Sequence, residues 1–305
     1  MLLFLLRRGI AALLLVFAVT SGALLLAQLA PGDYAAQFGR SPEQIAGDRH
    51  RLGLDRPFAE QYARWITRSL ALDFGESFQF QMPVVELVRA RAGNTAFLAL
   101  AALGLATLLG LPAGIFTGSR RGGVLPHLLR GLSLVLLSVP PLISSLVLLT
   151  IAARTGWLPV SGMDGPRHFI VPTLALALPV AAMLERLQSQ SIRDALQRPS
   201  ATAARARGIP AGRIVWRHAW RQSLGPILAV YGVIIGSLFS GSFAVEMVTS
   251  WPGLANLMRQ ALMARDTYLV AGCAAAGAAF LALGVLAADV AHKVADPRLE
   301  DVPGV

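Results

Sequence analysis

The stretch ERLQSQSIRDALQRPSATAARARGIPAGRIVWRHAWRQSLGP, residues 185–226, separates two long apolar segments. Its only acids are Glu185 and Asp194, whereas it holds eight arginines. These are Arg186, Arg193, Arg198, Arg205, Arg207, Arg213, Arg217 and Arg221. Short loops rich in Arg and Lys stay on the cytoplasmic side of a membrane. The stretch therefore predicts a cytoplasmic loop between two membrane spans.

The composition is typical of an integral membrane protein. Of the 305 residues, 55% are hydrophobic and 14% are charged, and the mean hydropathy is +0.59. A soluble domain carries about 25% charged residues. The net charge is +10, but the basic residues lie in loops, so this charge does not predict binding to nucleic acid. We expect membrane lipid around the chain and no nucleic-acid partner.

Six apolar stretches are long enough to cross the ~30 Å of hydrocarbon in a bilayer. They cover residues 9–30, 96–118, 131–153, 169–184, 226–245 and 267–288. If the N-terminus is inside, most basic residues of the short loops also lie inside, as the positive-inside rule requires. The sequence therefore predicts an all-α polytopic membrane protein with six transmembrane helices and both termini in the cytoplasm.

Residues 1–30 are expected to form an N-terminal transmembrane anchor helix. The alternative is a cleaved signal peptide, because Arg7 and Arg8 precede the apolar run and Ala27 to Ala30 resembles a cleavage site. The apolar run is longer than the ~7–15 residues of a signal-peptide core. We therefore favour the anchor.

Residues 31–95 are expected to form an extracytoplasmic helical segment. A helix should begin at Ser41-Pro42, which combines a capping residue with proline at the first helical position, and end near Gly53. A second helix should follow Pro57, with four large side chains on one face. These are Phe58, Tyr62, Trp65 and Ile66. The segment is equally compatible with a structural lid and with a landing surface for an extracytoplasmic partner.

Residues 96–291 are expected to form a five-helix core with the arginine-rich cytoplasmic loop at 186–225, followed by a cytoplasmic tail at 292–305. None of the six apolar stretches contains Asp, Glu, Lys, Arg or His. Ion-coupled carriers place ionisable groups within the membrane, so an ion-coupled secondary transporter is the disfavoured alternative. Sodium held by backbone carbonyls at broken helices remains open.

Small residues recur every four positions in two of the spans. The two sets are Gly110, Gly114 and Gly118, and Gly232, Gly236 and Ser240. Such stripes let helices approach closely, so we expect them to be packing surfaces, with a substrate path as the alternative. Pro112, Pro140-Pro141, Pro172 and Pro179 interrupt or bound spans and can kink them.

No catalytic, metal or cofactor motif is found in the sequence. The only lysine, Lys293, is followed by Val294, which excludes a phosphate-binding G-x-x-x-x-G-K-[ST] loop. The five histidines do not form a zinc motif, and no G-x-S-x-G elbow occurs. The single Cys273 excludes an intrachain disulfide. We therefore expect no enzyme activity, and no metal or cofactor bound by this chain.

The arginine-rich loop should fold as a helical hairpin. Ser191 to Arg207 contains good helix formers, but Pro199 should bend or split this helix. Gly208 can end it in the left-handed conformation, and Pro210 suits the start of the next helix. Ala203 and Ala204 should leave a shallow surface beside Arg205 and Arg207. The residues alone fit equally a hairpin that enters a partner's groove and arginines that only fix topology.

A series of short motifs lies along nearly the whole chain. They are Leu29-Ala30-Pro31-Gly32-Asp33, Leu52-Gly53-Leu54-Asp55-Arg56-Pro57 with Gln61-Tyr62 and Trp65, Asp73-Phe74-Gly75-Glu76-Ser77, Gly156-Trp157-Leu158-Pro159, Ala204-Arg205-Ala206-Arg207-Gly208 with Arg217-His218-Ala219, Glu246, Ser250-Trp251-Pro252-Gly253-Leu254, Ala264-Arg265-Asp266 and Asp296-Pro297-Arg298. In this order they resemble the permease subunits of ATP-binding-cassette importers for di- and oligopeptides, nickel and related solutes. The chain is similar to the first, B-type permease of that group.

The resemblance implies the type I ATP-binding-cassette importer fold in a bacterial inner membrane, and half of a translocation pathway for peptides or for nickel, an opine or glutathione. It implies a second permease, two ATPase subunits that bind the ATP, and an extracytoplasmic solute-binding protein. The loop motif would couple to the ATPase through Ala203, Ala204, Arg205, Arg207 and Gly208, with Arg217 and His218 beside it. We assign docking of the binding protein to Asp33, Asp55, Tyr62, Trp65, Trp251 and Asp266.

Overall fold

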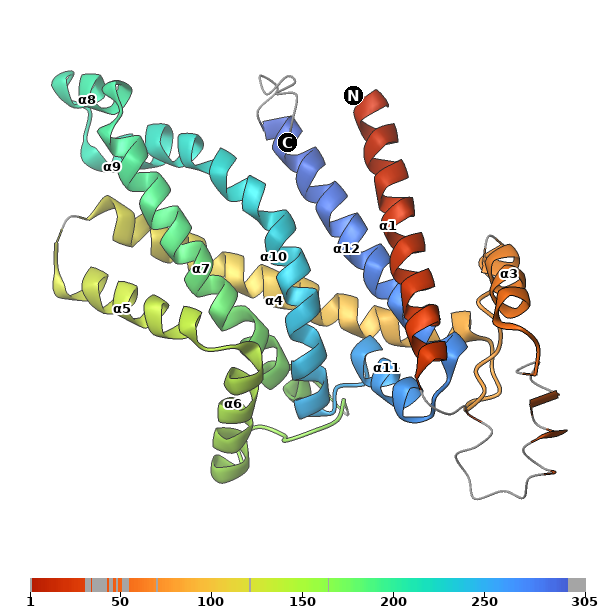
Figure 1. Ribbon diagram of the computed structural model, residues 1–305. Coiled ribbons are helices and arrows are strands. Elements are labelled where there is room, and N and C mark those ends of the chain that lie inside the picture. The colour runs from red at the N-terminus through yellow and green to blue at the C-terminus, as the bar shows by residue number, and fades with distance from the viewer. Residues whose placement is uncertain are drawn as a thin grey trace. The chain divides into compact units, whose positions relative to one another are not determined.

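The computed structural model describes residues 2–30, 55–69, 71–120, 122–163 and 165–295, together with residues 34, 43, 46, 47, 49 and 50. Within these residues the regular elements are helices (Figure 1), which confirms the all-α prediction. Three sequence-based expectations lie outside the described residues. They are most of the helix from Ser41 to Gly53, the docking residue Asp33 and the motif Asp296-Pro297-Arg298.

Among the described residues, five helices are long and apolar enough to cross a membrane. They are α1 (Leu2–Leu29), α4 (Val84–Ser119), α7 (Ile170–Gln197), α10 (Trp220–Thr249) and α12 (Thr267–Ala295). The pair α5 (Val124–Ser138) and α6 (Pro141–Thr155) adds a sixth if it counts as one span. The polytopic prediction is thereby confirmed with five spans, or with the predicted six when the bent pair is one span.

The third predicted span, residues 131–153, is not a single straight helix. The axes of α5 and α6 are bent by 106° at the break between them. Val139 (φ −97°, ψ 113°) and Pro140 (φ −60°, ψ 151°) are both extended, because a residue that precedes proline avoids the helical region. Pro141 then opens α6 at the first helical position, where its missing N–H costs nothing. The proline pair therefore breaks the span, whereas Pro112 and Pro179 lie inside continuous helices.

Contacts within the chain define two compact units, residues 1–96 with 252–282 and residues 97–251 with 283–305. This division differs from the expected one in two ways. Helix α4 continues through the boundary expected at 95/96. Residues 252–282, which were assigned to the core, group with the N-terminal part of the chain.

The first unit contains α1, the amphipathic helix α3 (Phe58–Ser69), the start of α4, the short helix α11 (Leu254–Met263) and the start of α12. Trp65 of α3 is buried with Leu24 of α1 and Ala271 of α12, and Tyr62 and Ile66 pack against this cluster. The predicted apolar face of the helix after Pro57 is therefore confirmed.

The second unit is built around α7, which contacts α5, α6 and α10. The predicted glycine stripe of α4 packs against it. A Cβ atom added to Gly110, Gly114 or Gly118 would lie within 2.6 Å of a backbone carbonyl oxygen of α7. The three carbonyls belong to Ala181, Glu185 and Ser189, which lie one turn apart on α7. This confirms the packing role of the first stripe, whereas Gly232 and Gly236 are half-buried and Ser240 is exposed.

Candidate functional site

The arginine-rich segment forms a helical hairpin at the end of α7 and the beginning of α10 (Figure 1). Helix α7 ends at Gln197, Arg198 is extended, and Pro199 opens the separate helix α8 (Pro199–Ala206). The predicted split at Pro199 is therefore confirmed. After Pro210 the chain is helical again, through α9 (Ala211–Ile214), η3 (Val215–Ala219) and α10. The expected loop at 186–225 is thus mostly helical, and the turn itself occupies residues 207–210.

The turn after α8 requires glycine at position 208. The amide of Ile209 donates to Ala204 O (3.2 Å) and that of Gly208 donates to Arg205 O (2.9 Å), which is the Schellman arrangement. It places Gly208 at φ +74°, in the left-handed region that costs other residues roughly 1–2 kcal/mol. A Cβ there would meet no atom within 4 Å, so the backbone angle selects the glycine and available space does not.

The hairpin has a small apolar core of its own. Ala201, Ala204 and Ile214 are buried, and Leu196 and Ile209 pack against them. Ala204 is 0% exposed, which corrects the expectation that it belongs to the outer surface. Its methyl group fills the core because α8 folds back over α9. Ala203 is exposed and keeps its expected place on the surface.

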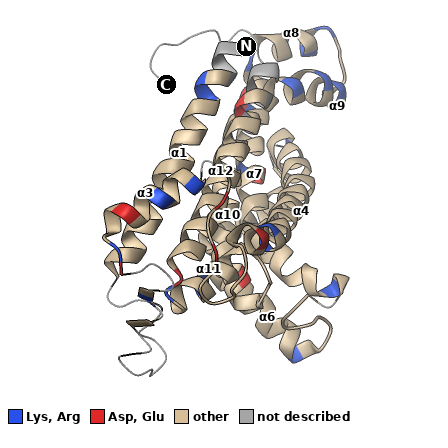
Figure 2. Cartoon of the chain, turned by 90° about the vertical axis from the view of Figure 1, so that its right-hand side faces the viewer, with Lys and Arg blue, Asp and Glu red and all other residues tan. Residues whose placement is uncertain are grey.

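All eight arginines of the segment are exposed, and Figure 2 shows basic residues on α8 and α9. The guanidinium group of Arg205 donates to Leu196 O (2.9 Å) and so connects α8 to the end of α7. Among the described residues, none of the eight forms an ion pair. The hairpin therefore presents unneutralised donors around the small side chain of Ala203.

The second arm of the hairpin, which leads from α9 into α10, contains a π-helical turn, η3. Single π turns are frequent at functional sites. This turn carries the exposed Arg217 and the half-buried His218. It also carries the exposed Trp216, whose ring centroid lies 6.3 Å from that of Trp220. Sequence patterns gave no sign of this turn, since the i→i+5 hydrogen bonding has no residue signature.

Buried polar contacts connect the helices below the hairpin. Thr117 Oγ1 of α4 donates to Glu185 Oε1 of α7, and Gln188 Nε2 of α7 donates to Ser223 Oγ of α10 (2.8 Å). The helices are longer than the apolar stretches that defined them, so α7 and α10 also include the buried Glu185 and Glu246. The absence of charge holds for the apolar stretches and not for the whole helices.

The residues assigned to docking of a binding protein do not form one exposed surface. Trp65, Trp251 and Asp266 are 5%, 2% and 0% exposed. This corrects the expectation that these three side chains lie on the surface. Trp65 packs between α1 and α12, whereas the ring of Trp251 packs against that of Phe169 at an interplanar angle of 50°, with centroids 5.6 Å apart.

The other two described docking candidates are more accessible. Tyr62 is half-buried and Asp55 is exposed. His50 Nδ1 lies 2.7 Å from Asp55 Oδ2, and this hydrogen bond holds the pKa of the Asp55 carboxyl below its usual value.

Asp266 organises the turn at 73–83 and the start of α12. Its carboxylate accepts hydrogen bonds from Ser77 Oγ (2.6 Å), from the amide of Gln79 (3.1 Å) and from that of Leu269 (3.1 Å). Burial nevertheless raises the pKa of the Asp266 carboxyl, against the effect of these donors. The Asp266 carboxylate therefore holds this turn to the N-terminus of α12 through hydrogen bonds.

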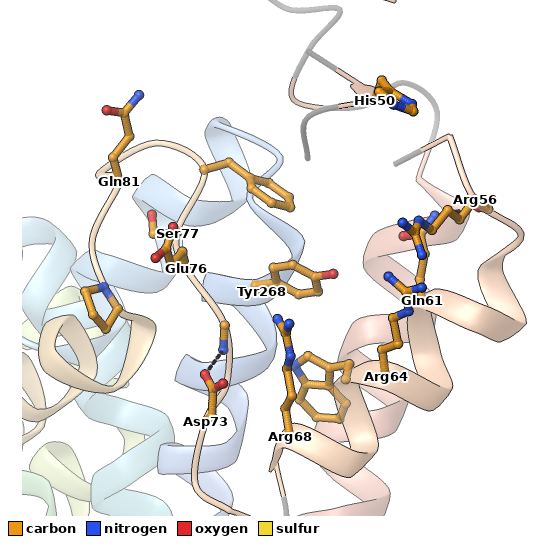
Figure 3. A pocket seen from close by; sticks show the side chains of 14 residues that line it. His50, Arg56, Gln61, Arg64, Arg68, Asp73, Glu76, Ser77, Gln81 and Tyr268 are labelled. Carbon is orange, nitrogen blue, oxygen red and sulfur yellow. Dashed lines mark hydrogen bonds between the residues drawn. The ribbon is translucent and has the colours of Figure 1, made fainter. Parts of the chain in front are cut away.

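A polar cavity of about 760 Å³ lies beside this turn in the first unit. Figure 3 shows residues of α3 on one side, residues of the turn on the other and Tyr268 between them. Its labelled lining residues are His50, Arg56, Gln61, Arg64, Arg68, Asp73, Glu76, Ser77, Gln81 and Tyr268. Sequence reasoning missed this cavity because its walls come from segments distant in the chain. Within the described residues, no three His, Cys, Asp or Glu side chains are placed to hold a metal ion.

Apolar helices that can span a membrane and an exposed basic hairpin agree with a membrane transport permease. Residues 110–301 match the family described as "Binding-protein-dependent transport system inner membrane component", and residues 1–99 match its N-terminal family. The chain belongs to this family. It is a multi-pass membrane permease subunit of an ATP-binding-cassette importer, and not an enzyme.

Two relatives agree with this assignment. The chain is 28% identical to the oligopeptide transport system permease protein AppB of Bacillus subtilis, over 97% of this chain and 99% of the relative. It is 34% identical to the glutathione transport system permease protein GsiC of Salmonella paratyphi A, over 85% of each chain.

Proposed function

We propose that the hairpin formed by α8, the turn at 207–210 and α9 is the surface through which an ATPase subunit drives this permease. The observation that supports this most strongly is the exposed, self-packed hairpin with unneutralised arginines around Ala203. Arg205, Arg207 and Arg217 would donate charge-assisted hydrogen bonds to acidic or carbonyl groups of the partner. Gly208 fixes the turn, and His218 lies beside the contact.

The small core of the hairpin supports transmission of force. Because Ala204 and Ile214 join α8 to α9, the two helices move together. The guanidinium group of Arg205 ties α8 to the end of α7. A displacement of α8 by the ATPase subunit would therefore also displace α7 and α10. These are the two helices that precede and follow the hairpin in the chain.

The arginines also support an orientation. In the second unit, Gly118 at the end of α4 packs on Ser189 of α7, so Arg120 and Arg130 lie at the same end of the bundle as the hairpin. By the positive-inside rule this end faces the cytoplasm. The termini of the chain are then cytoplasmic as well, and the segment between α1 and α4 is extracytoplasmic.

The partners and the solute follow from the family and the relatives. The importer would contain a second permease subunit, two ATPase subunits that bind the ATP, and an extracytoplasmic solute-binding protein. The solute would be a di- or oligopeptide or a related compound, such as glutathione, an opine or a nickel complex. Asp55 and Tyr62 are the described residues that remain candidates for docking of the binding protein.

Replacing Ala203 by tryptophan tests the coupling proposal. We expect Ala203→Trp to leave the amount of folded chain unchanged, because the site is exposed. It should lower the ATPase activity that co-purifies with the tagged chain at least about tenfold. A tenfold loss corresponds to ~1.4 kcal/mol of binding free energy between the permease and the ATPase subunit. The measurement is ATP hydrolysis by material isolated from the native membrane in mild detergent.

The matched control is Leu13→Trp, which adds the same ring at an exposed position of α1 away from the hairpin. It should keep the ATP hydrolysis of the unchanged chain. Equal ATP hydrolysis from Ala203→Trp and Leu13→Trp would refute the coupling role of this surface.

A further inference from the structure

The cavity beside α3 leaves several polar groups without partners. Glu60 accepts hydrogen bonds from Arg56 (2.9 Å) and Arg64 (2.7 Å), so these two arginines are already paired. In the part of the chain that the structure describes, no hydrogen bond or ion pair is found for the Arg68 guanidinium, the Tyr268 hydroxyl or the Glu76 carboxylate. One cation, one hydroxyl and one anion therefore line the same cavity unpaired.

A buried donor beside the cavity is also unsatisfied. Trp65 lines the cavity and is 5% exposed, and among the described residues its indole Nε1–H has no acceptor. Water does not reach this atom, so no solvent hydrogen bond replaces the missing one. An unpaired buried donor costs free energy, so Trp65 adds a polar group without an acceptor to the wall of the cavity.

The charges are arranged as two walls of opposite sign. Arg68 and Trp65 belong to α3, whereas Asp73 and Glu76 belong to the turn, with Tyr268 between the walls (Figure 3). Asp73 Oδ1 already accepts the amide of Gly75 (2.9 Å), so Glu76 is the free acid. A ligand that carries a carboxylate at one end and an ammonium group at the other matches both walls.

We propose that this cavity binds a short zwitterionic peptide directly, with its carboxylate toward Arg68 and Tyr268 and its ammonium group toward Glu76. A volume of about 760 Å³ is within the ~300–1,000 Å³ range of small-molecule sites. The permease then holds the solute at a site of its own on the first unit. This inference rests on the peptide class of solute proposed above and does not depend on the coupling hairpin.

The test uses the purified full-length chain in detergent and L-alanyl-L-alanine as the probe, with binding followed by ligand-observed NMR. We expect Arg68→Gln to raise the Kd at least about tenfold, because it removes a charge-assisted hydrogen bond. L-alanyl-L-alaninamide, which lacks the carboxylate, should bind the unchanged chain more weakly by a similar factor. Glu76→Gln should weaken binding of L-alanyl-L-alanine but not of its N-acetyl derivative.

Arg89→Gln is the matched control, since Arg89 is an exposed arginine of α4 that does not line the cavity. It should bind the probe as the unchanged chain does. Cys273, which is buried, should stay unreactive toward a thiol dye in every variant that is folded.

Absence of L-alanyl-L-alanine binding to the unchanged chain would overturn the inference, as would equal binding by folded Arg68→Gln. Neither result would affect the coupling proposal, which Ala203→Trp tests separately. If the dipeptide binds as expected while Ala203→Trp keeps its ATP hydrolysis, the cavity assignment stands and only the coupling proposal fails.

Discussion

Gly114→Leu is expected to abolish accumulation of the folded protein in the membrane. At this position α4 and α7 are in backbone contact, and a Cβ atom alone would lie 2.6 Å from Glu185 O. A leucine side chain has no open space there, so the helices must separate. Overpacking a well-packed site by a few atoms already costs about 1–3 kcal/mol. Separation would in addition break the buried contact between Thr117 and Glu185.

Gly104→Leu provides the comparison on the same helix. A Cβ atom on Gly104 meets nothing within 4 Å, so the larger side chain fits without displacement. Leucine also favours the helix over glycine by about 0.5–1 kcal/mol. We expect normal yield and a single symmetric peak in size-exclusion chromatography for Gly104→Leu, and aggregated or degraded protein for Gly114→Leu. Similar behaviour of the two variants would contradict the close packing of α4 on α7.

Asp266→Ala is expected to unfold the turn at 73–83 and lower the apparent melting temperature by roughly 5–15 °C. Three donors, Ser77 Oγ and the amides of Gln79 and Leu269, lose their acceptor in a buried place. Each unsatisfied buried donor costs about 1–3 kcal/mol. The melting temperature can be followed by reaction of the buried Cys273 with a thiol dye during heating.

Asp266→Asn separates the hydrogen bonds from the charge. Asparagine keeps one acceptor oxygen, so the melting temperature of Asp266→Asn should lie between those of Asp266→Ala and the unchanged chain.

Burial raises the pKa of the Asp266 carboxyl in the folded chain above its usual value of 3.8. The folded state therefore binds this proton more tightly than the unfolded state does. Stability from this group is greatest below the unfolded pKa and is lost as pH rises through the folded pKa.

In Asp266→Asn this pH-dependent loss should be absent. The measurement is the melting temperature by circular dichroism across the acidic range, in the unchanged chain and in the variant. Identical pH profiles would show that Asp266 does not titrate differently in the folded chain.

Hydrophobicity and helix-terminating residues made much of the fold predictable. The apolar stretches predicted the membrane spans from their length. Pro199 predicted the break before α8 and Gly208 predicted the end of α8, because both follow from local backbone conformation. The stripe of Gly110, Gly114 and Gly118 gave a packing surface, although its partner α7 could not be read from the sequence. The sharp bend between α5 and α6 was underestimated, since a proline pair signals a kink but not its angle.

Tertiary contacts account for what the sequence did not reveal. Ala203 and Ala204 are identical residues, yet one is exposed and the other fills the core of the hairpin. Motif membership suggested Trp251 and Asp266 as docking residues, whereas the fold buries both. The cavity between α3 and the turn at 73–83 also depends on long-range packing, because Tyr268 joins its walls from the start of α12.

The central proposal is that an ATP-binding subunit binds the hairpin of this permease. Cys273 is the only cysteine, so a chain with Cys273→Ala and Ala203→Cys carries one thiol on the hairpin for a photo-crosslinker. Crosslinking in the native membrane is predicted to yield an adduct that is labelled by azido-ATP, and the same crosslinker on Leu13→Cys should yield none. An adduct at position 203 without ATP-binding protein, or equal labelling from position 13, would contradict the account.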